Sequence, residues 1–474
     1  MLFNSLEFPI FLLIVYCLYW VLGRRRQNVL LVIASSMFYG WWDWRFLALL
    51  WYSVVFDYLV GLRIDASDSL ASRRRWLALS VAGNLGLLGF FKYFNFFIES
   101  AAQLLIALGL EPNQPSLRII LPVGISFYTF QTLSYTIDIY RRNMEAEREF
   151  SAYAAYVMFF PQLVAGPIER ATRFLPQFKV SRTFDVDAAR DGVRQILWGF
   201  FKKMAVADLL AVYVNTIYAD PAQASSWELL GVTYCFALQI YCDFSGYSDI
   251  AVGTARLFGF SLMRNFAYPY FAVSIRDFWS RWHISLSTWF RDYVYVPLGG
   301  NRVSALRHAL NVFATFTLSG LWHGAKWTFV VWGAVHGLLV MAEHVVDRRR
   351  RPRPVENVGG GLRLGRIVRV VVTFHLVVLL WVFFRATSVS QALAILAKIL
   401  SPTGWPTFDP AWLPAWLVLC VLVALEWTGR LKPHVLAGVW RMAPLRRRVI
   451  YAAVVAAIFL LNPTTHVPFI YFQF

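Results

Sequence analysis

The chain has 474 residues, of which 58% are hydrophobic, 17% are aromatic and only 15% are charged. This composition is too apolar for a soluble globular protein of this length, so it excludes that class and indicates an integral membrane protein. The formal net charge of +18 does not indicate a nucleic-acid partner, because the basic residues form short clusters beside apolar runs, where they favour cytoplasmic loops and contact with anionic membrane lipids.

Apolar runs separated by short polar breaks predict the membrane helices. A full span needs about 20 apolar residues, and several runs are shorter than this, so we expect about ten to twelve membrane helices, some of them broken or re-entrant. The predicted fold is an all-α polytopic membrane protein, with residues 1–474 in a single membrane domain. The first run lacks both a basic segment before it and a cleavage site after it, which favours a retained span over a signal peptide. The runs are residues 8–22, 29–42, 46–62, 76–91, 119–137, 229–241, 330–340, 370–384, 412–425 and 449–461.

Two segments in the C-terminal part of the chain predict its topology. Residues 347–366 are rich in Arg, Pro and Gly, which suits a cytoplasmic loop. Basic residues between 430 and 448 precede the last run and, if they are cytoplasmic, send that run outward. The C-terminal tail, residues 462–474, is therefore expected on the outer side of the membrane.

The stretch "YCDFSGYSDIAVG", residues 241–253, places acidic residues in an apolar run. Charged groups at bilayer depth cost roughly 2.5–3.5 kcal/mol or more, so such residues usually have a task. Asp243 and Asp249, with Ser245 between them, either relay protons or ions, as in a transporter, or anchor basic side chains. We favour the anchoring role, because paired charges are the usual way to keep a carboxylate out of water. The expected partners are Arg276, Arg281 and Arg291.

The stretch "FWSRWHISLSTWFRDYVYVPLGGNR", residues 278–302, combines Trp and Arg residues with a terminal Pro-Leu-Gly-Gly. This pattern predicts an interfacial or re-entrant helix that ends at a turn. For His283, within it, a structural hydrogen-bonding role is favoured over catalysis. The four cysteines lie in apolar runs without the spacing of metal ligands, so no metal site is expected.

In "SGLWHGAKWTFVVWGAVHG", residues 319–337, two histidines lie thirteen residues apart. On one continuous helix this separation is about 20 Å, so His323 and His336 could not share a proton. Gly320 and Gly324 weaken a helix around His323, which predicts a helix break there and places His336 deep in the following span. A lone histidine in an apolar helix is usually a core residue, but two beside other polar motifs are candidate general bases.

Six stretches of the sequence together resemble the membrane-bound O-acyltransferase family, in the bacterial branch typified by alginate O-acetylation proteins. The resemblance follows their order and spacing through nearly the whole chain, and it is specific because no single stretch carries it. The stretches are "LPVGISFYTFQTLSYTIDIYR", "FFPQLVAGPIER", "YCDFSGYSDIAVG", "FWSRWHISLSTWFRDYVYVPLGGNR", "GLWHGAKWTFVVWGAVHG" and "WVFFRA".

The resemblance implies a bundle of membrane helices with a funnel on each side that meets at a buried histidine. His336 matches the family's catalytic histidine, and His323 matches its second functional position. The family moves an acyl group from a thioester, typically acyl-coenzyme A, to a hydroxyl, so no bound cofactor is expected and acetyl-coenzyme A is the expected donor. Further residues expected to support the site are Asp243, Ser245, Asp249, Arg281, His283 and Trp322.

The C-terminal sequence "FIYFQF", residues 469–474, is similar to the F-x-Y-x-x-F motif of the small partner protein in the cell-wall D-alanylation system. There the resemblance implies a tyrosine that carries the acyl group outward, which makes Tyr471 a candidate acyl carrier. The alternative is an aromatic anchor at the membrane interface, a role that any terminal Phe-Tyr cluster could have.

These features together predict a multi-pass protein of the bacterial inner membrane that moves acetyl from acetyl-coenzyme A to an exopolysaccharide or cell-wall polymer such as alginate. The expected partners are acyl-coenzyme A, membrane lipids, an extracytoplasmic acetyltransferase and the polysaccharide machinery. Two alternatives remain: a transporter or channel with an Asp/His relay inside the membrane, and an enzyme that acylates a lipid directly.

Overall fold

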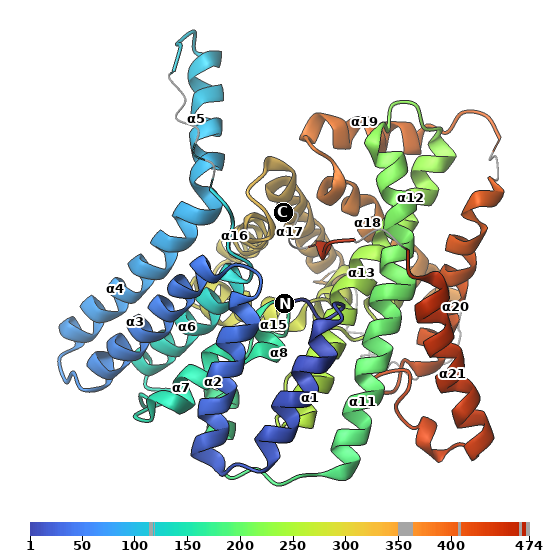
Figure 1. Ribbon diagram of the computed structural model, residues 1–474. Helices are drawn as coiled ribbons and strands as arrows, with labels where there is room; N and C mark the ends of the chain where they lie inside the picture. The colour runs from blue at the N-terminus through green and yellow to red at the C-terminus, as the bar shows by residue number, and fades with distance from the viewer. Residues whose placement is uncertain (113–116, 118, 349–363, 406–408, 464–466, 471–474) are drawn as a thin grey trace. The chain divides into compact units, whose positions relative to one another are not determined.

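The structure is a computed structural model that describes residues 1–474 except 113–116, 118, 349–363, 406–408, 464–466 and 471–474 (Figure 1). Within these residues the regular secondary structure is helical, and no strand occurs among them. The prediction of an all-α protein is therefore confirmed. Most of the loop expected at 347–366 and the candidate carrier Tyr471 lie outside the described residues.

Helices long and apolar enough to cross a membrane occur in the described part of the chain, as the hydropathy pattern predicts. Lipid offers no hydrogen-bond partners, so a spanning backbone has to satisfy its own polar groups, and a helix does this. Each apolar run falls at least partly on a helix, whereas the number of spans stays a prediction. Among the described residues, five helices meet the length and hydropathy of a span: Trp44–Asp65, Leu70–Ala107, Trp327–Val346, Leu364–Arg385 and Pro410–Gly429.

Residue contacts divide the chain into two compact units. Unit 1 comprises Met1–Gly192 with Thr254–Met263, and unit 2 comprises Val193–Gly253 with Arg264–Phe474. The expectation of one membrane domain over residues 1–474 stays a prediction. Every candidate site residue that the structure describes belongs to unit 2, so the site can be described within that unit alone.

Unit 1 contains the N-terminal helices and is held partly by buried polar contacts. Asp57 accepts hydrogen bonds from Ser80 Oγ and Asn84 Nδ2, both at 2.7 Å, so this buried carboxylate has partners on the next helix. The helices are α1 (Glu7–Trp20), α2 (Arg24–Gly40), η1 (Trp44–Phe46), α3 (Leu47–Asp65), α4 (Leu70–Leu88), η2 (Gly89–Tyr93), α5 (Phe94–Ala107), α6 (Ile125–Tyr140), α7 (Phe150–Met158), α8 (Phe160–Leu163), α9 (Ala171–Phe174) and α10 (Pro176–Lys179).

Unit 2 holds the remaining helices, except that α11 begins in unit 1 and the last residues of α13 belong to unit 1. Its most extensive pairing of helices is between α16 (Ala305–His323) and α17 (Trp327–Arg348), which follow one another in the chain and lie side by side in Figure 1. The other helices are α11 (Val186–Phe200), η3 (Phe201–Ala207), α12 (Asp208–Ala219), α13 (Ser226–Leu257), η4 (Pro269–Phe271), α14 (Ile275–Arg281), α15 (Ile284–Phe290), η5 (Arg291–Tyr295), α18 (Leu364–Arg385), α19 (Val389–Leu400), η6 (Pro410–Trp412), α20 (Leu413–Gly429), η7 (Val439–Arg441) and α21 (Pro444–Leu461).

The segment expected to form one interfacial or re-entrant helix, residues 278–302, is divided instead. α14 is capped by Ser274, whose hydroxyl accepts the Asp277 N–H, and it ends at Arg281. His283 then adopts a left-handed backbone conformation with φ +43°, which no helix can contain, before α15 and η5 continue the chain. The prediction of a single helix was wrong because the chain breaks at His283. Nothing in the sequence indicated this break, which is visible only in the backbone angles.

Candidate active site

The hairpin of α16 and α17 brings the two motif histidines together. Gly320 and Gly333 let the two backbones meet, because a Cβ atom on Gly320 would lie 2.2 Å from the Phe329 carbonyl oxygen. α16 ends at His323, and Gly324 follows in an extended conformation. The expected helix break is confirmed, although it falls at Gly324, while Gly320 serves close packing within the helix.

His336 lies in the middle of α17 and is completely buried. Its Nδ1 accepts a hydrogen bond from Trp279 Nε1 on α14 at 3.3 Å, and the Phe278 ring stacks nearly parallel to it with centroids 6.5 Å apart. Among the described residues no partner lies within hydrogen-bond distance of His336 Nε2. A buried polar atom without a partner calls for an explanation, and a reacting group is one of the accepted explanations.

Trp332 contacts both motif histidines. Its ring centroid lies 5.3 Å from that of His323 and 4.8 Å from that of His336, with both imidazoles tilted steeply against it. His323 is also buried and lies beside Trp322 and Phe384, at 5.1 and 5.3 Å between centroids. The two histidines are therefore linked through an aromatic ring that both touch.

His283 joins the same cluster from the turn between α14 and α15. It is completely buried, and its ring centroid lies 6.2 Å from that of His323 and 4.6 Å from that of Phe244 on α13. Trp322, which was expected to support the site, contacts His283 as well, at 5.8 Å between centroids. The structure thus brings His283, His323, Trp322 and His336 into one aromatic cluster, which we call the histidine cluster.

Asp243 and Asp249 are anchors of basic residues, but the expected partners were wrong. Lys203 Nζ lies 2.7 Å from Asp243 Oδ1, and Lys202 Nζ lies 2.6 Å from Asp249 Oδ2. Lys202 Nζ also donates to Ser245 Oγ at 2.8 Å. The three arginines expected in this role pair elsewhere: Arg276 with Glu343, Arg281 with Asp277, and Arg291 with Asp292.

The two lysines reach α13 because two helices approach closely. A Cβ atom on Gly246 would lie 2.8 Å from the Gly199 carbonyl oxygen, so α11 and α13 touch at this pair of glycines. The π-helical turn η3 follows and carries both lysines, whose exposed fractions are 3% and 0%. The general expectation that basic clusters lie in cytoplasmic loops and contact anionic lipids is therefore wrong for Lys202 and Lys203.

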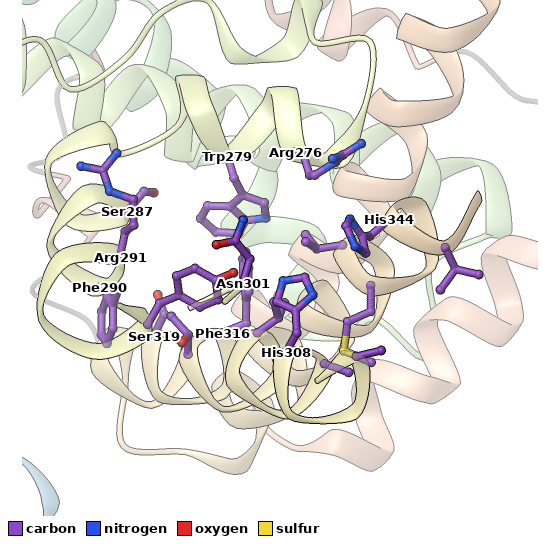
Figure 2. Close-up of a pocket in the computed structure, with 18 residues that line it drawn as sticks. Arg276, Trp279, Ser287, Phe290, Arg291, Asn301, His308, Phe316, Ser319 and His344 are labelled. Carbon is purple, nitrogen blue, oxygen red and sulfur yellow. The ribbon is translucent and has the colours of Figure 1, made fainter. Parts of the chain in front are cut away.

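A cavity of about 530 Å³ lies between α14, α15, η5, α16 and α17. Figure 2 shows Trp279, His308 and His344 around the same space, with Arg276 near its rim. The ring centroids of His308 and His344 are 4.9 Å apart. Because Trp279 both lines this cavity and donates to His336, the cavity ends one side chain away from the buried histidine.

Several residues of this site were missed at the level of the sequence. Trp332 lies four residues before His336, a spacing that places both on one helix face, so this contact could have been found. Trp279 and the cavity residues His308 and His344 gave no comparable signal. Among the residues that the structure describes, no group of three or more His, Cys, Asp or Glu side chains could hold a metal ion.

The arrangement can exchange a proton at a buried imidazole that is shielded from water by aromatic rings. This is the chemistry of group transfer with general-base assistance. Residues 147–386, which contain the histidine cluster, both buried lysine–aspartate pairs and the cavity, match the membrane-bound O-acyltransferase family. The chain belongs to this family and is a multi-pass membrane O-acyltransferase.

Similar proteins have descriptions that name several different polymers. The chain is 41% identical over 409 residues to a Pseudomonas aeruginosa protein described as "Probable alginate O-acetylase AlgI", an alignment that covers 85% of this chain and 76% of the relative. It is 34% identical over 417 residues to the peptidoglycan O-acetyltransferase of Helicobacter pylori, covering 81% and 77%. The teichoic acid D-alanyltransferase of Bacillus subtilis is 27% identical over 281 residues, covering 56% and 69%. These similarities favour acyl transfer over the transporter or channel alternative.

Proposed function

We propose that this protein takes an acetyl group from acetyl-coenzyme A at the bacterial inner membrane and passes it outward for O-acetylation of an exopolysaccharide or cell-wall polymer. The observation that carries the proposal is His336, a buried imidazole whose Nε2 has no partner among the described residues and whose neighbour Trp279 lines a cavity. The two similar O-acetylating proteins, described as acting on alginate and on peptidoglycan, support acetyl as the group and a polysaccharide as the final acceptor.

The cavity between α14 and α17 supports the choice of an acyl-coenzyme A as donor. Its volume of about 530 Å³ is in the range of small-molecule sites. Arg276, Arg291 and the imidazoles of His308 and His344 line it together with apolar side chains. Such a lining suits a ligand with anionic phosphates and a long uncharged arm.

His336 would act as general base at Nε2, the ring nitrogen that Trp279 does not occupy. It takes the proton of the acceptor hydroxyl as the hydroxyl oxygen bonds to the thioester carbonyl carbon. The carbon–sulfur bond then breaks, and the proton passes to the departing thiolate to give free coenzyme A. General-base assistance contributes typically about 10²–10⁴-fold. His323 supports this step through Trp332, whose ring touches both imidazoles.

Tyr471 is the proposed first acceptor. Its phenol is a poor nucleophile at neutral pH unless a base removes its proton, which is the task assigned to His336. With the C-terminal tail on the outer side of the membrane, the acetyl-tyrosine would be open to a separate extracytoplasmic acetyltransferase. That partner would move the acetyl group to the polymer. Direct acylation of a lipid is the competing outcome.

The test gives the purified full-length protein acetyl-coenzyme A labelled in the acetyl group and follows coenzyme A release and label on the C-terminal peptide. We expect release with label on Tyr471 in the wild type, and a loss of about 10²–10⁴-fold in both signals in His336→Ala. Tyr471→Phe should remove the label. Release without label on the tail would point to direct transfer onto an external acceptor or lipid, and near-normal turnover in His336→Ala would overturn the assignment of the base.

A further inference from the structure

The end of the described C-terminal tail lies inside unit 2 and not on its surface. Phe469 and Ile470 have exposed fractions of 1% and 2%. The backbone N–H of Ile470 donates to Asp243 Oδ2 at 2.7 Å, and the carbonyl oxygen of Val467 lies 3.5 Å from Lys203 Nζ. An aromatic anchor at the membrane interface would have its side chain outside the protein, so the burial of Phe469 argues against that role for this residue.

The charged groups around Lys203 need a further hydrogen-bond donor, and a backbone N–H can supply it. Lys203 Nζ contacts two carboxylates, Asp208 at 2.8 Å and Asp243 at 2.7 Å, so the three groups carry one formal negative charge in excess. Buried excess charge is costly unless further hydrogen bonds compensate for it. The N–H of Ile470 supplies one of these hydrogen bonds. It donates to Asp243 Oδ2, whereas Lys203 contacts Asp243 Oδ1.

Aromatic contacts lead from the tail to the histidine cluster. The ring centroid of Phe469 lies 4.4 Å from that of Tyr247 and 6.0 Å from that of Phe244, both on α13. Phe244 in turn contacts His283, which contacts His323. The tail is therefore buried next to Phe244, a residue that contacts the histidine cluster.

We propose that Asp243, held by Lys203, is a clasp that positions the C-terminal tail beside the histidine cluster. The inference rests on the proposed function in one respect, namely that the tail carries the acyl group on Tyr471, the residue that directly follows the clasped Ile470. Asp243 is then a positioning residue and not a proton relay. It acts by fixing the backbone one residue before the carrier.

Charge balance provides a matched pair of variants. Asp243→Ala removes the carboxylate that holds the tail and leaves Lys203 paired with Asp208. Asp208→Ala removes the same charge from the same lysine and leaves the tail contact in place. Asp243→Asn is a milder second variant, because its amide oxygen is a weaker, neutral acceptor of similar size.

The measurement is hydrogen–deuterium exchange of the tail peptide in the purified full-length protein without acetyl-coenzyme A, with peptides of α21 as the control for folding. A hydrogen bond to a charged group corresponds to roughly a tenfold to hundredfold change in an equilibrium constant. We therefore expect the Ile470 amide to exchange at least about tenfold faster in Asp243→Ala than in Asp208→Ala, with Asp243→Asn between them. Equal exchange in the two alanine variants would overturn the clasp, and so would an Asp243→Asn variant that exchanges like Asp208→Ala.

Label transfer from acetyl-coenzyme A separates the clasp from the proposed function. If the clasp positions the carrier, acetylation of Tyr471 slows by about the same factor in Asp243→Ala as the tail amide exchange accelerates. If exchange separates the variants while no protein acquires label, the clasp stands and the carrier role of Tyr471 fails. If the tail acquires label equally in both alanine variants, the clasp does not position the carrier and this inference fails.

Discussion

The indole Nε1–H of Trp279 donates a hydrogen bond to Nδ1 of His336 at 3.3 Å. An indole nitrogen is only a donor, so Nδ1 accepts and the neutral imidazole of this arrangement holds its proton on Nε2. A general base at Nε2 needs the opposite tautomer, with the proton on Nδ1. The Trp279 bond therefore stabilises the resting form of His336 and has to break before the proposed proton transfer.

Trp279→Phe should raise turnover. The substitution keeps an aromatic ring beside His336 and removes the donor, which no longer favours the resting tautomer. A neutral hydrogen bond contributes about 1 kcal/mol, so we expect up to about a fivefold increase in coenzyme A release where the base step limits the rate. The control is Trp332→Phe, which truncates another indole in contact with His336 without touching Nδ1. A loss of turnover in Trp279→Phe would mean that the indole contributes to the reaction itself.

Substitutions of His323 and Trp332 should have coupled effects on turnover. If His323 supports His336 through the indole that both contact, its loss matters less once Trp332 has changed. We expect His323→Leu to lower turnover about tenfold and Trp332→Phe to lower it several-fold, while the double variant falls by less than the product, with a coupling of roughly 0.5–1 kcal/mol. The double-mutant cycle is read from coenzyme A release at saturating donor. Strictly multiplicative effects on turnover would show that His323 does not act through Trp332.

The sequence predicted those elements whose signal is local. The runs at 229–241 and 330–340 are apolar enough to predict α13 and α17, and Gly324 predicted the break after His323. α16 was missed as a run because its polar residues, among them His308 and Thr315, line the cavity and lower its hydropathy. A helix with polar side chains along a cavity has the low hydropathy of a loop, so hydropathy alone does not predict it.

Contacts between distant segments could not be predicted in the same way. Lys202 and Lys203 have the sequence character of a basic cluster beside a span, and only the meeting of Gly199 with Gly246 turns them toward α13. Along the chain, Arg276 and Arg281 also lie nearer to the two aspartates than the lysines do. A charge pattern reveals that a buried carboxylate needs a partner, but the helix packing selects which partner it has.

Glu169, in unit 1, should make stability depend on pH. It is fully buried in the segment between α8 and α9, and burial raises its pKa from the ordinary 4.5 to about 7, although the N–H of Met263 and the charge of Arg173 act in the opposite direction. The folded protein then keeps a proton that the unfolded chain releases. The free energy of unfolding should therefore fall as the pH rises from about 4.5 to about 7, by on the order of 3 kcal/mol.

Glu169→Gln tests this expectation, because a glutamine keeps the shape of the side chain and cannot ionise. Thermal unfolding of the detergent-solubilised protein, followed across pH 4.5 to 7, should show a weaker decline in the variant than in the wild type. Parallel pH profiles in the two proteins would show that Glu169 is ionised in the folded state throughout this range.

Gly320→Ala should separate the α16–α17 hairpin. The added Cβ atom would lie 2.2 Å from the carbonyl oxygen of Phe329, a backbone atom that cannot move aside without shifting α17. Overpacking of this kind costs about 1–3 kcal/mol or more, and a shift of α17 displaces His336 relative to His323 on α16, so both stability and turnover should fall.

The matched control for Gly320→Ala is Gly86→Ala on α4, where the added atom meets nothing within 4 Å. Replacing a helical glycine in open space stabilises a helix by about 0.5–1 kcal/mol, so this variant should melt at an equal or higher temperature with unchanged coenzyme A release. The same Gly→Ala change is thus expected to lower stability at position 320 and to keep or raise it at position 86. If Gly320→Ala melted like Gly86→Ala and kept its turnover, the close contact of the two helices would not hold the histidine cluster together.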